Sequence, residues 1–223
     1  GGRTAKLTEE KIKESKELIQ ALGLPIIQAP SEGEAQASYL VKNNDAFGVV
    51  SQDYDALMFG CPKLIRNLSI AGKRKRKGKL GYKTIQPEII SLSKTLNNLG
   101  IDQRQLIILG ILVGTDYNPG GIKGVGPKTA LKLVKKYDDL DKIFKEVEWN
   151  KYFDYSWEEV YNTFTKIPIK KKYNLQWNDL NPEKIKKVLV DKHDFSEDRI
   201  NNKLKKLLKK IKERNQKGLS EWF

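Results

Sequence analysis

Apolar side chains recur at helical spacing in the segments 8–22 and 196–211, near the two ends of the chain. Polar residues, most of them lysine in the second segment, occupy the positions between them. This periodicity predicts two amphipathic helices, the first ending at Gly23 and the second beginning at Ser196. The apolar positions are Ile12, Leu18, Ile19 and Leu22 in the first helix, and Ile200, Leu204, Leu207, Leu208 and Ile211 in the second.

Short apolar runs alternate with helical patterns in the first half of the chain. A helix is expected over residues 32–42, and another over residues 103–113 with Asp102 as its N-cap. Strands that alternate with helices predict an α/β domain with a largely parallel sheet. The expected strands are residues 24–27, 46–50 and 64–70.

The pattern changes after Gly114, where glycines cluster and helical segments follow. Residues 148–183 are rich in aromatic and turn-forming residues, and we assign no element to them. Residues 72–83 are dense in lysine, arginine and glycine, which is typical of a solvated hairpin and also compatible with phosphate contact. The expected divisions of the chain are 1–117, 118–195, 196–215 and 216–223.

The charge of the chain suggests what it binds. There are 42 basic and 28 acidic residues, which give a formal charge of +14. Such an excess favours a polyanionic partner, nucleic acid first, although a lysine-rich soluble surface is the alternative. Cys61 is the only cysteine and there is one histidine, so an intrachain disulfide and a zinc finger are excluded. No apolar run is long enough to span a membrane and no signal peptide is visible, so no membrane partner is expected.

Acidic residues recur at the ends of the expected elements. Glu32 and Glu34 follow the first strand, Asp53 and Asp55 follow the second, and Asp116 follows the buried helix. In parallel α/β sheets, sites gather at the carboxyl ends of strands. A cluster of hard oxygen ligands suits Mg²⁺ or Mn²⁺, and two such ions can stabilise the attacking and leaving oxygens of a phosphodiester.

Each of these acids also has a structural interpretation. Ser31 and Glu34 match a capping box, and Glu32 in a first helical turn suits the helix dipole. The two aspartates of the second pair could be turn residues. Asp116 with Asn118 could shape a loop. The spacing alone leaves both interpretations open.

Residues 121–134 have the glycine and apolar spacing of a helix-hairpin-helix. Two glycines permit a tight turn close to a ligand, and Pro127 suits the first turn of the next helix. The exposed N–H groups at that helix start would meet a phosphate without reading bases. An ordinary packing unit of two helices is the alternative. The residues expected to contact DNA are Gly121, Lys123, Gly124, Gly126, Lys128 and Thr129.

The last eight residues carry apolar side chains that a terminal tail has little reason to expose unless a partner buries them. One helical turn would place three of them on one face, for insertion into an apolar groove. Docking of the tail on its own domain is the alternative. The spacing, set by Gln216, Leu219, Trp222 and Phe223, resembles the peptide by which replication and repair proteins bind the sliding clamp of the PCNA type.

Taken together, the motifs resemble those of archaeal flap endonucleases, in consistent order over nearly the whole chain. The resemblance rests on residues 30–40, 51–60, 64–70, 111–131 and 216–223. It implies a PIN-like α/β nuclease core with a helix-hairpin-helix (H3TH) module and a C-terminal helical region. It also implies 5′-flap cleavage in DNA replication and repair, with an additional 5′–3′ exonuclease activity.

The resemblance further implies two Mg²⁺ ions per site, with Mn²⁺ as a substitute, held by Glu32, Glu34, Asp53, Asp55 and Asp116. A K⁺ ion is expected at the hairpin, which would grip duplex DNA. An archaeal protein of this kind would act in the cytoplasm on the nucleoid, and a eukaryotic one in the nucleus.

One departure from the family pattern affects the expected activity. Members carry an N-terminal region with two further metal-binding aspartates, and nothing in residues 1–20 corresponds to it. We therefore expect that an N-terminal half belongs to the complete protein, as a separate chain or as a lost part of this one. This chain alone should bind DNA and the clamp but cleave poorly. The alternatives are a non-catalytic module that binds DNA and the clamp, and an RNA-cutting PIN-type nuclease, against which the tail argues.

Overall fold

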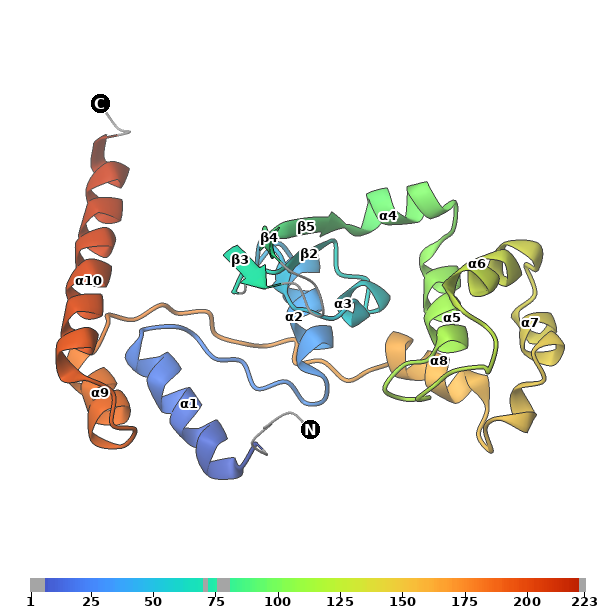
Figure 1. The fold of residues 1–223 in the computed structure, drawn as a ribbon, viewed down its shortest axis with the longest axis horizontal. Helices are drawn as coiled ribbons and strands as arrows, with labels where there is room; N and C mark the ends of the chain where they lie inside the picture. The colour runs from blue at the N-terminus through green and yellow to red at the C-terminus, as the bar shows by residue number, and fades with distance from the viewer. Residues whose placement is uncertain (1–6, 70–71, 76–80, 221–223) are drawn as a thin grey trace. The chain divides into compact units, whose positions relative to one another are not determined.

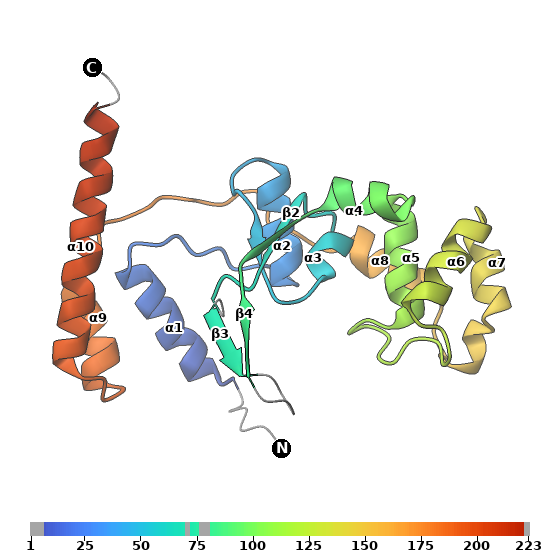
Figure 2. The ribbon, with the colours of Figure 1, turned by 45° about the horizontal axis from the view of Figure 1, so that its top comes forward.

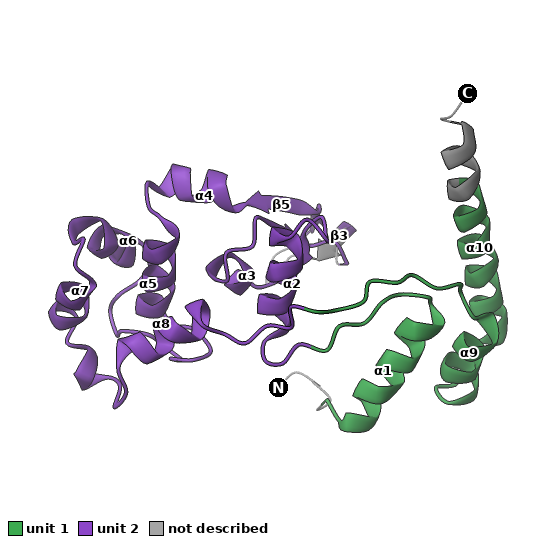
Figure 3. Ribbon diagram, turned by 180° about the vertical axis from the view of Figure 1, so that it is seen from behind, with its two compact units in different colours: residues 1–28, 172–223 green, residues 29–171 purple. Residues whose placement is uncertain are grey.

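The computed structural model describes residues 7–69, 72–75 and 81–220, leaving aside the side chains of 73–75, 83 and 214–220. The chain divides into two compact units (Figure 3). Unit 2 comprises residues 29–171 and contains all the acids singled out above. Unit 1 combines residues 1–28 with residues 172–223, so it is built from both ends of the chain. The four divisions expected from the sequence were defined by function, which these two compact units do not test, so they stay predictions.

The sheet of unit 2 is small and mixed (Figure 1). Its order is β1-β2-β5, with β1 (Val49–Val50) parallel to β2 (Lys63–Arg66) and β5 (Glu88–Ser91) antiparallel to β2. The expected α/β class is confirmed, whereas a largely parallel sheet is not. The reason is that the chain returns to the sheet through a hairpin, β3 (Gly72–Lys75) with β4 (Tyr82–Ile85), instead of a helical crossover (Figure 2).

The predicted strand at residues 24–27 is wrong. This segment forms no strand, and Leu24 is 36% exposed. Residues 24–28 lead from unit 1 towards unit 2, where they join no ladder among the described strands. Pro25 also lacks the N–H that a ladder needs. The apolar character of this run was therefore not sufficient to predict that it pairs with another strand.

One face of the sheet is covered by α2 (Gly33–Lys42) and α3 (Asp55–Met58). Val49 and Leu64 point to this face and are buried with Val41 and Leu57. The alternation of strand residues sends their neighbours to the other face. There Val50, Ile65 and Ile89 lie in register across the three strands, with Val50 53% and Ile89 60% exposed.

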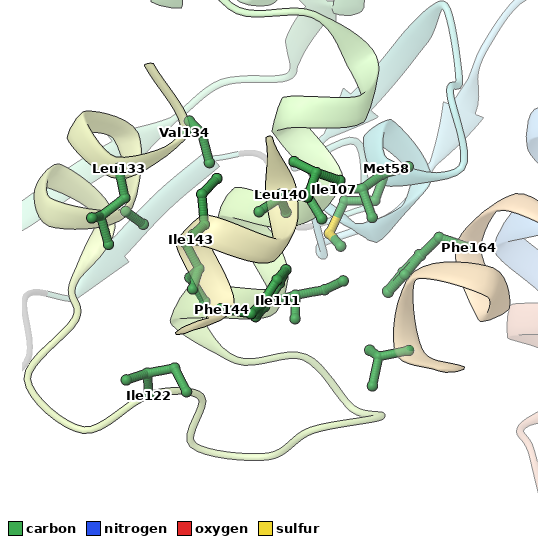
Figure 4. Packing of buried hydrophobic residues seen from close by; sticks show 14 of the residues in the cluster. Met58, Ile107, Ile111, Ile122, Leu133, Val134, Leu140, Ile143, Phe144 and Phe164 are labelled. Carbon is green, nitrogen blue, oxygen red and sulfur yellow. The ribbon is translucent and has the colours of Figure 1, made fainter. Parts of the chain in front are cut away.

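The rest of unit 2 is helical and is organised around α5 (Gln103–Val113). Asp102 caps α5 as predicted and forms a full capping box with Gln105. Ile108 and Ile111 of α5 are completely buried in a core that also contains Met58 and Phe164 (Figure 4). The other elements are α4 (Leu92–Leu99), α6 (Pro127–Lys136), α7 (Leu140–Glu146), the short η1 (Trp149–Lys151) and α8 (Trp157–Thr165).

Unit 1 is helical in its described part. The two helices predicted near the chain ends are confirmed as α1 (Glu9–Ala21), capped by Thr8, and α10 (Glu197–Ser220). They pack with α9 (Pro182–Lys186) and the π-helical turn η2 (Lys187–Asp191) around a small core of Ala21, Ile185, Ile200 and Leu204. Among the described residues, no helix has both the length and the apolar character needed to cross a membrane.

Ile111 and Ile89 provide a matched test of where the core of unit 2 lies. Ile111→Ala removes a fully buried side chain of α5, so we expect a loss of about 2–5 kcal/mol in the free energy of unfolding. Ile89→Ala makes the same chemical change on the exposed sheet face and should cost less than about 1 kcal/mol. Urea unfolding followed by circular dichroism measures both. Equal losses would place the core elsewhere.

Candidate functional site

The acids predicted from the sequence come together in unit 2. Glu32 and Glu34 lie at the start of α2, Asp53 and Asp55 at the turn into α3, and Asp116 in the loop after α5. Burial raises the pKa of the half-buried Asp55, and the negative charges of Glu34, Asp116, Asp53 and Glu32 raise it further, in that order. The four other carboxylates therefore lie close enough to Asp55 for their charges to act on it.

These carboxylates have no cationic partner within the described part of the chain. None of the salt bridges found there involves any of the five. Their side-chain donors are neutral hydroxyls: Ser51 donates to Glu34, and Tyr117 donates to Glu32. Burial and then the bond to Glu32 raise the pKa of Tyr117, so its hydroxyl keeps the proton that it donates. No described cation or charged donor therefore offsets the negative charge of the cluster.

The capping-box interpretation of the first pair is wrong. The N-cap of α2 is Glu32 instead of Ser31, and it makes no side-chain cap bond. The carboxylate of Glu34 accepts from the hydroxyl of Ser51, on a different segment. Both glutamates are consequently available to the cluster.

The turn that carries Asp53 is held by the sheet and by an arginine. The backbone N–H of Ser51 donates to the Ile65 carbonyl of β2 at 3.2 Å. Arg66 donates from Nε to the Gln52 carbonyl at 3.1 Å and from a terminal nitrogen to the Tyr54 hydroxyl, and its guanidinium lies 4.2 Å from the centre of the Tyr54 ring. Arg66 therefore stabilises the turn through bonds to neutral groups, and these bonds leave the charges of the acids unpaired.

The short helix α3 is fixed at its far end. Lys42 of α2 donates to the Phe59 carbonyl at 2.7 Å, and Gln103 of α5 donates from Nε2 to the Leu57 and Met58 carbonyls at 3.0 and 2.8 Å. These bonds satisfy the Met58 and Phe59 carbonyls at the helix end, and they add to the bond that the Leu57 carbonyl accepts from the Gly60 N–H. Because α3 has only four residues, fixing its end also places Asp55 at its start. Nothing in the sequence pattern marks Gln103 for this role.

Asn118 holds the loop that carries Asp116. Its completely buried side chain accepts from the Thr115 N–H at 3.2 Å and the Thr115 hydroxyl at 2.6 Å, and donates to the Ile111 carbonyl at 2.7 Å. Of the structural alternative for Asp116 with Asn118, the shaping of a loop is therefore confirmed for Asn118. Asp116 itself is exposed, so the loop presents it to the cluster without burying it.

Three of the five acids, Asp53, Asp55 and Asp116, line an open hollow of about 550 Å³ together with Tyr54 and residues 113–115, 119 and 120. Hard oxygen donors with uncompensated charge fit a divalent cation in kind. Their spacing is looser than that of a formed site, because no three acid, histidine or cysteine side chains in the described residues lie close enough to enclose one ion. The fit is therefore one of chemistry and charge.

The predicted hairpin follows directly from the Asp116 loop. Gly121 is buried with φ +55°, and a Cβ there would lie 2.4 Å from the Val113 backbone, so no other residue fits. Gly124 has φ +85° and open space around it. Gly126 is the N-cap of α6 and makes no side-chain cap bond, and Pro127 follows at the first turn. The first N–H groups of α6 are left without a capping side chain, beside the exposed Lys123, Lys128 and Thr129.

The predicted clamp-binding residues Gln216, Leu219, Trp222 and Phe223 lie outside the side chains that the structure describes. Their role stays a prediction, as does the K⁺ ion at the hairpin.

The chain is similar to known proteins in sequence and in fold. Residues 23–116, which include all five acids, match the XPG I-region. The flap endonuclease 1 of Staphylothermus marinus is 48% identical over 99% of this chain and 63% of that protein. The flap endonuclease-1 structure from Methanococcus jannaschii is 38% identical, with a TM-score of 0.78 over 93% of this chain and 60% of that one. The catalytic core of Rad2 in complex with a DNA substrate, 22% identical with a TM-score of 0.67 over 87% of this chain and 67% of that one, shares the fold.

The chain thus has a PIN-like α/β fold with helical regions, and residues 23–116 of it match the XPG I-region. It is similar in sequence to the archaeal flap endonucleases over 98–99% of its length, as the motifs predict. It spans 63% of the length of these curated relatives, somewhat less than two thirds.

Asp55→Asn tests the repulsion within the cluster. A raised pKa means that folding disfavours the charged form of Asp55, so a neutral amide should stabilise the metal-free protein at pH 7. Since solvent screens much of the effect at this half-buried site, we expect a rise in Tm of about 1–2 °C. The gain should shrink as the pH falls towards the ordinary aspartate pKa of about 3.9, where the wild-type carboxyl is also neutral.

Glu183→Gln is the matched control, because Glu183 also lies in a first helical turn, that of α9, where it is the only acid. Thermal unfolding at several pH values measures both variants. A lower Tm for Asp55→Asn than for the wild type at pH 7 would contradict the repulsion.

Proposed function

We propose that the protein is a structure-specific endonuclease that hydrolyses branched DNA at a 5′ flap with two divalent metal ions. The observation that carries the proposal is the convergence of five uncompensated carboxylates from three separate segments. Negative side chains repel DNA, so their gathering in a chain of charge +14 needs a cation to explain it.

The metal ions, Mg²⁺ with Mn²⁺ as a substitute, would be held by Glu32, Glu34, Asp53, Asp55 and Asp116. Bound there, they would supply charge stabilisation for the attacking and leaving oxygens of the phosphodiester. The hydroxyls of Ser51 and Tyr117 orient two of the glutamates without neutralising them.

The hairpin would hold the duplex next to this cluster. The uncapped start of α6 offers backbone N–H groups and the positive end of a helix dipole to a phosphate. Lys123 and Lys128 add charge on the same exposed turn. Because these contacts are made to the backbone, recognition would depend on DNA shape instead of base sequence. A K⁺ ion at the hairpin would strengthen the same grip.

Action in DNA replication and repair is part of the proposal, as is recruitment to a sliding clamp through Gln216, Leu219, Trp222 and Phe223. The order of Leu, Trp and Phe after a lysine-rich stretch of sequence supports an apolar groove as the partner surface. The protein would then work in the cytoplasm of an archaeal cell, on its nucleoid.

Incision is proposed to need more polypeptide than these 223 residues. The relatives are longer, since the match covers 63% of their length. The three-stranded sheet leaves Val50 and Ile89 exposed on its second face, and an apolar face of this kind normally packs on another element. An N-terminal half, in the same or a separate chain, would complete the protein.

A non-catalytic module that binds DNA and the clamp is the second candidate. It is favoured by the loose spacing of the acids, of which no three within the described residues enclose one ion. The two candidates differ in a single property, which is incision.

The test is incision of a labelled 5′-flap duplex in Mg²⁺, by the chain alone and by the chain with an N-terminal half supplied in trans. We expect flap binding by the chain alone, with incision weak or absent, and incision at the flap junction when both parts are present. EDTA should abolish it, and Asp53→Ala should reduce it by at least about 100-fold. Unchanged DNA affinity with no incision under any complementation would favour the binding module.

The contribution of the hairpin can be measured without incision. Lys128→Ala should weaken binding to duplexes of any sequence equally and reduce the slope of log K against log salt by about 1, as loss of one phosphate contact requires. Lys145→Ala on α7 removes an exposed lysine outside the hairpin and should leave the slope unchanged. Fluorescence anisotropy over a salt series measures both. An equal effect of the two variants would mean that only the general charge of the surface matters.

A further inference from the structure

We propose that Ser51 positions the Glu34 and Asp53 side of the acidic cluster, and that its hydroxyl thereby sets the affinity of the cluster for divalent cations. The inference rests on the metal-binding role proposed above and adds to it a residue that is not itself a ligand. Ser51 acts through the two acids that it contacts, so it is a positioning residue.

Three hydrogen bonds place Ser51 between the sheet and the acids. Its backbone N–H donates to the Ile65 carbonyl of β2 at 3.2 Å, which fixes Ser51 at the end of the sheet. Its hydroxyl oxygen accepts from the backbone N–H of Asp53 at 3.1 Å. The same hydroxyl donates to Oε1 of Glu34, which belongs to α2. The Tyr117 hydroxyl makes a corresponding link from the loop after α5 to Glu32.

The direction of these bonds is determined by the chemistry of the groups. A backbone N–H can only donate, and an ionised carboxylate can only accept. A serine hydroxyl has one proton and can accept as well as donate. With its oxygen occupied by the Asp53 N–H, the proton is left for Glu34. The bridge therefore has one orientation, and the Glu34 carboxylate is fixed relative to the turn that carries Asp53.

A neutral bridge suits a site that must attract cations. A lysine in place of Ser51 would also bind Glu34, but it would cancel one negative charge of the cluster. Arg66 likewise leaves the charge of the acids uncancelled, because its described bonds go to the Gln52 carbonyl and the Tyr54 hydroxyl. Ser51 orders the acids while leaving their charge for a metal ion.

Without the hydroxyl, nothing described would hold the Glu34 carboxylate against the repulsion of the other acids. Removing the partner that orients a metal ligand typically lowers metal affinity by about 10- to 100-fold. We expect the lower end here, about 10-fold, because the other acids remain. Ser51→Thr keeps the hydroxyl and should keep the affinity near that of the wild type.

The first experiment is a titration with Mg²⁺ and Mn²⁺ followed by thermal shift and calorimetry. Ser51→Ala should raise the half-saturating metal concentration by about 10-fold, and Ser51→Thr should restore it. Ser38→Ala is the matched control, since the Ser38 hydroxyl bonds the backbone carbonyls of Glu34 and Ala56 and no carboxylate. It should lower stability without a comparable change in metal affinity. In a Glu34→Gln background, Ser51→Ala should have little further effect.

Amide hydrogen exchange of the metal-free protein is the second experiment. Ser51→Ala should speed exchange at Asp53, and Ser51→Thr should protect it. If Ser51→Ala matches the wild type in metal affinity, or if its effect persists fully with Glu34→Gln, the proposal is overturned. A wild type that responds to neither metal refutes the metal-binding function itself and the effect on affinity. Exchange at Asp53 then decides by itself whether the bridge exists.

Discussion

Like-charge repulsion among the five carboxylates is the constraint that the surrounding structure must overcome. The acids come from α2, from the turn into α3 and from the loop after α5, and no cation of the described chain offsets them. Apart from the hydroxyls of Ser51 and Tyr117, the bonds that hold these segments are made away from the charged groups. Gln103 and Lys42 fix the far end of α3, and Asn118 fixes the loop from inside the core.

This arrangement separates the groups that carry charge from the groups that provide stability. The helix α5 is central to it, because its start supplies Gln103, its middle fills the core with Ile108 and Ile111, and its end leads into the Asp116 loop. A site held in this way can stay negatively charged and exposed to solvent while its framework is buried. Such a division is expected where charge repulsion at a functional site must be offset by stabilising contacts elsewhere in the fold.

Sequence reasoning reached those features whose causes are local. The Asp102 cap, the two helices near the chain ends and the glycine turn before Pro127 each follow from a few neighbouring residues. The acids were identifiable because they recur at element ends, a pattern that survives without knowledge of the contacts.

Features that depend on distant partners were not predictable in the same way. The run 24–27 is apolar enough for a strand, yet a strand exists only where a neighbour pairs with it. The bond between Ser51 and Glu34 spans 17 residues, and that between Gln103 and Leu57 spans 46. A serine before an acidic turn and a glutamine in a helix are too common to signal such roles. The mixed order of the sheet likewise depends on the β3–β4 hairpin, which redirects the chain.

The loop between α5 and the hairpin is closed on itself, and this geometry would fix the distance along the DNA between binding and hydrolysis. Its ends meet so closely that a Cβ on Gly114 would lie 2.7 Å from the backbone nitrogen of Gly121, and Asn118 locks the interior. Asp116 and the hairpin are thereby joined at a constant offset. Under the proposed function, this fixed offset would determine how many nucleotides separate the phosphate bound by the hairpin from the phosphate that is hydrolysed. That number would not depend on the sequence of the DNA.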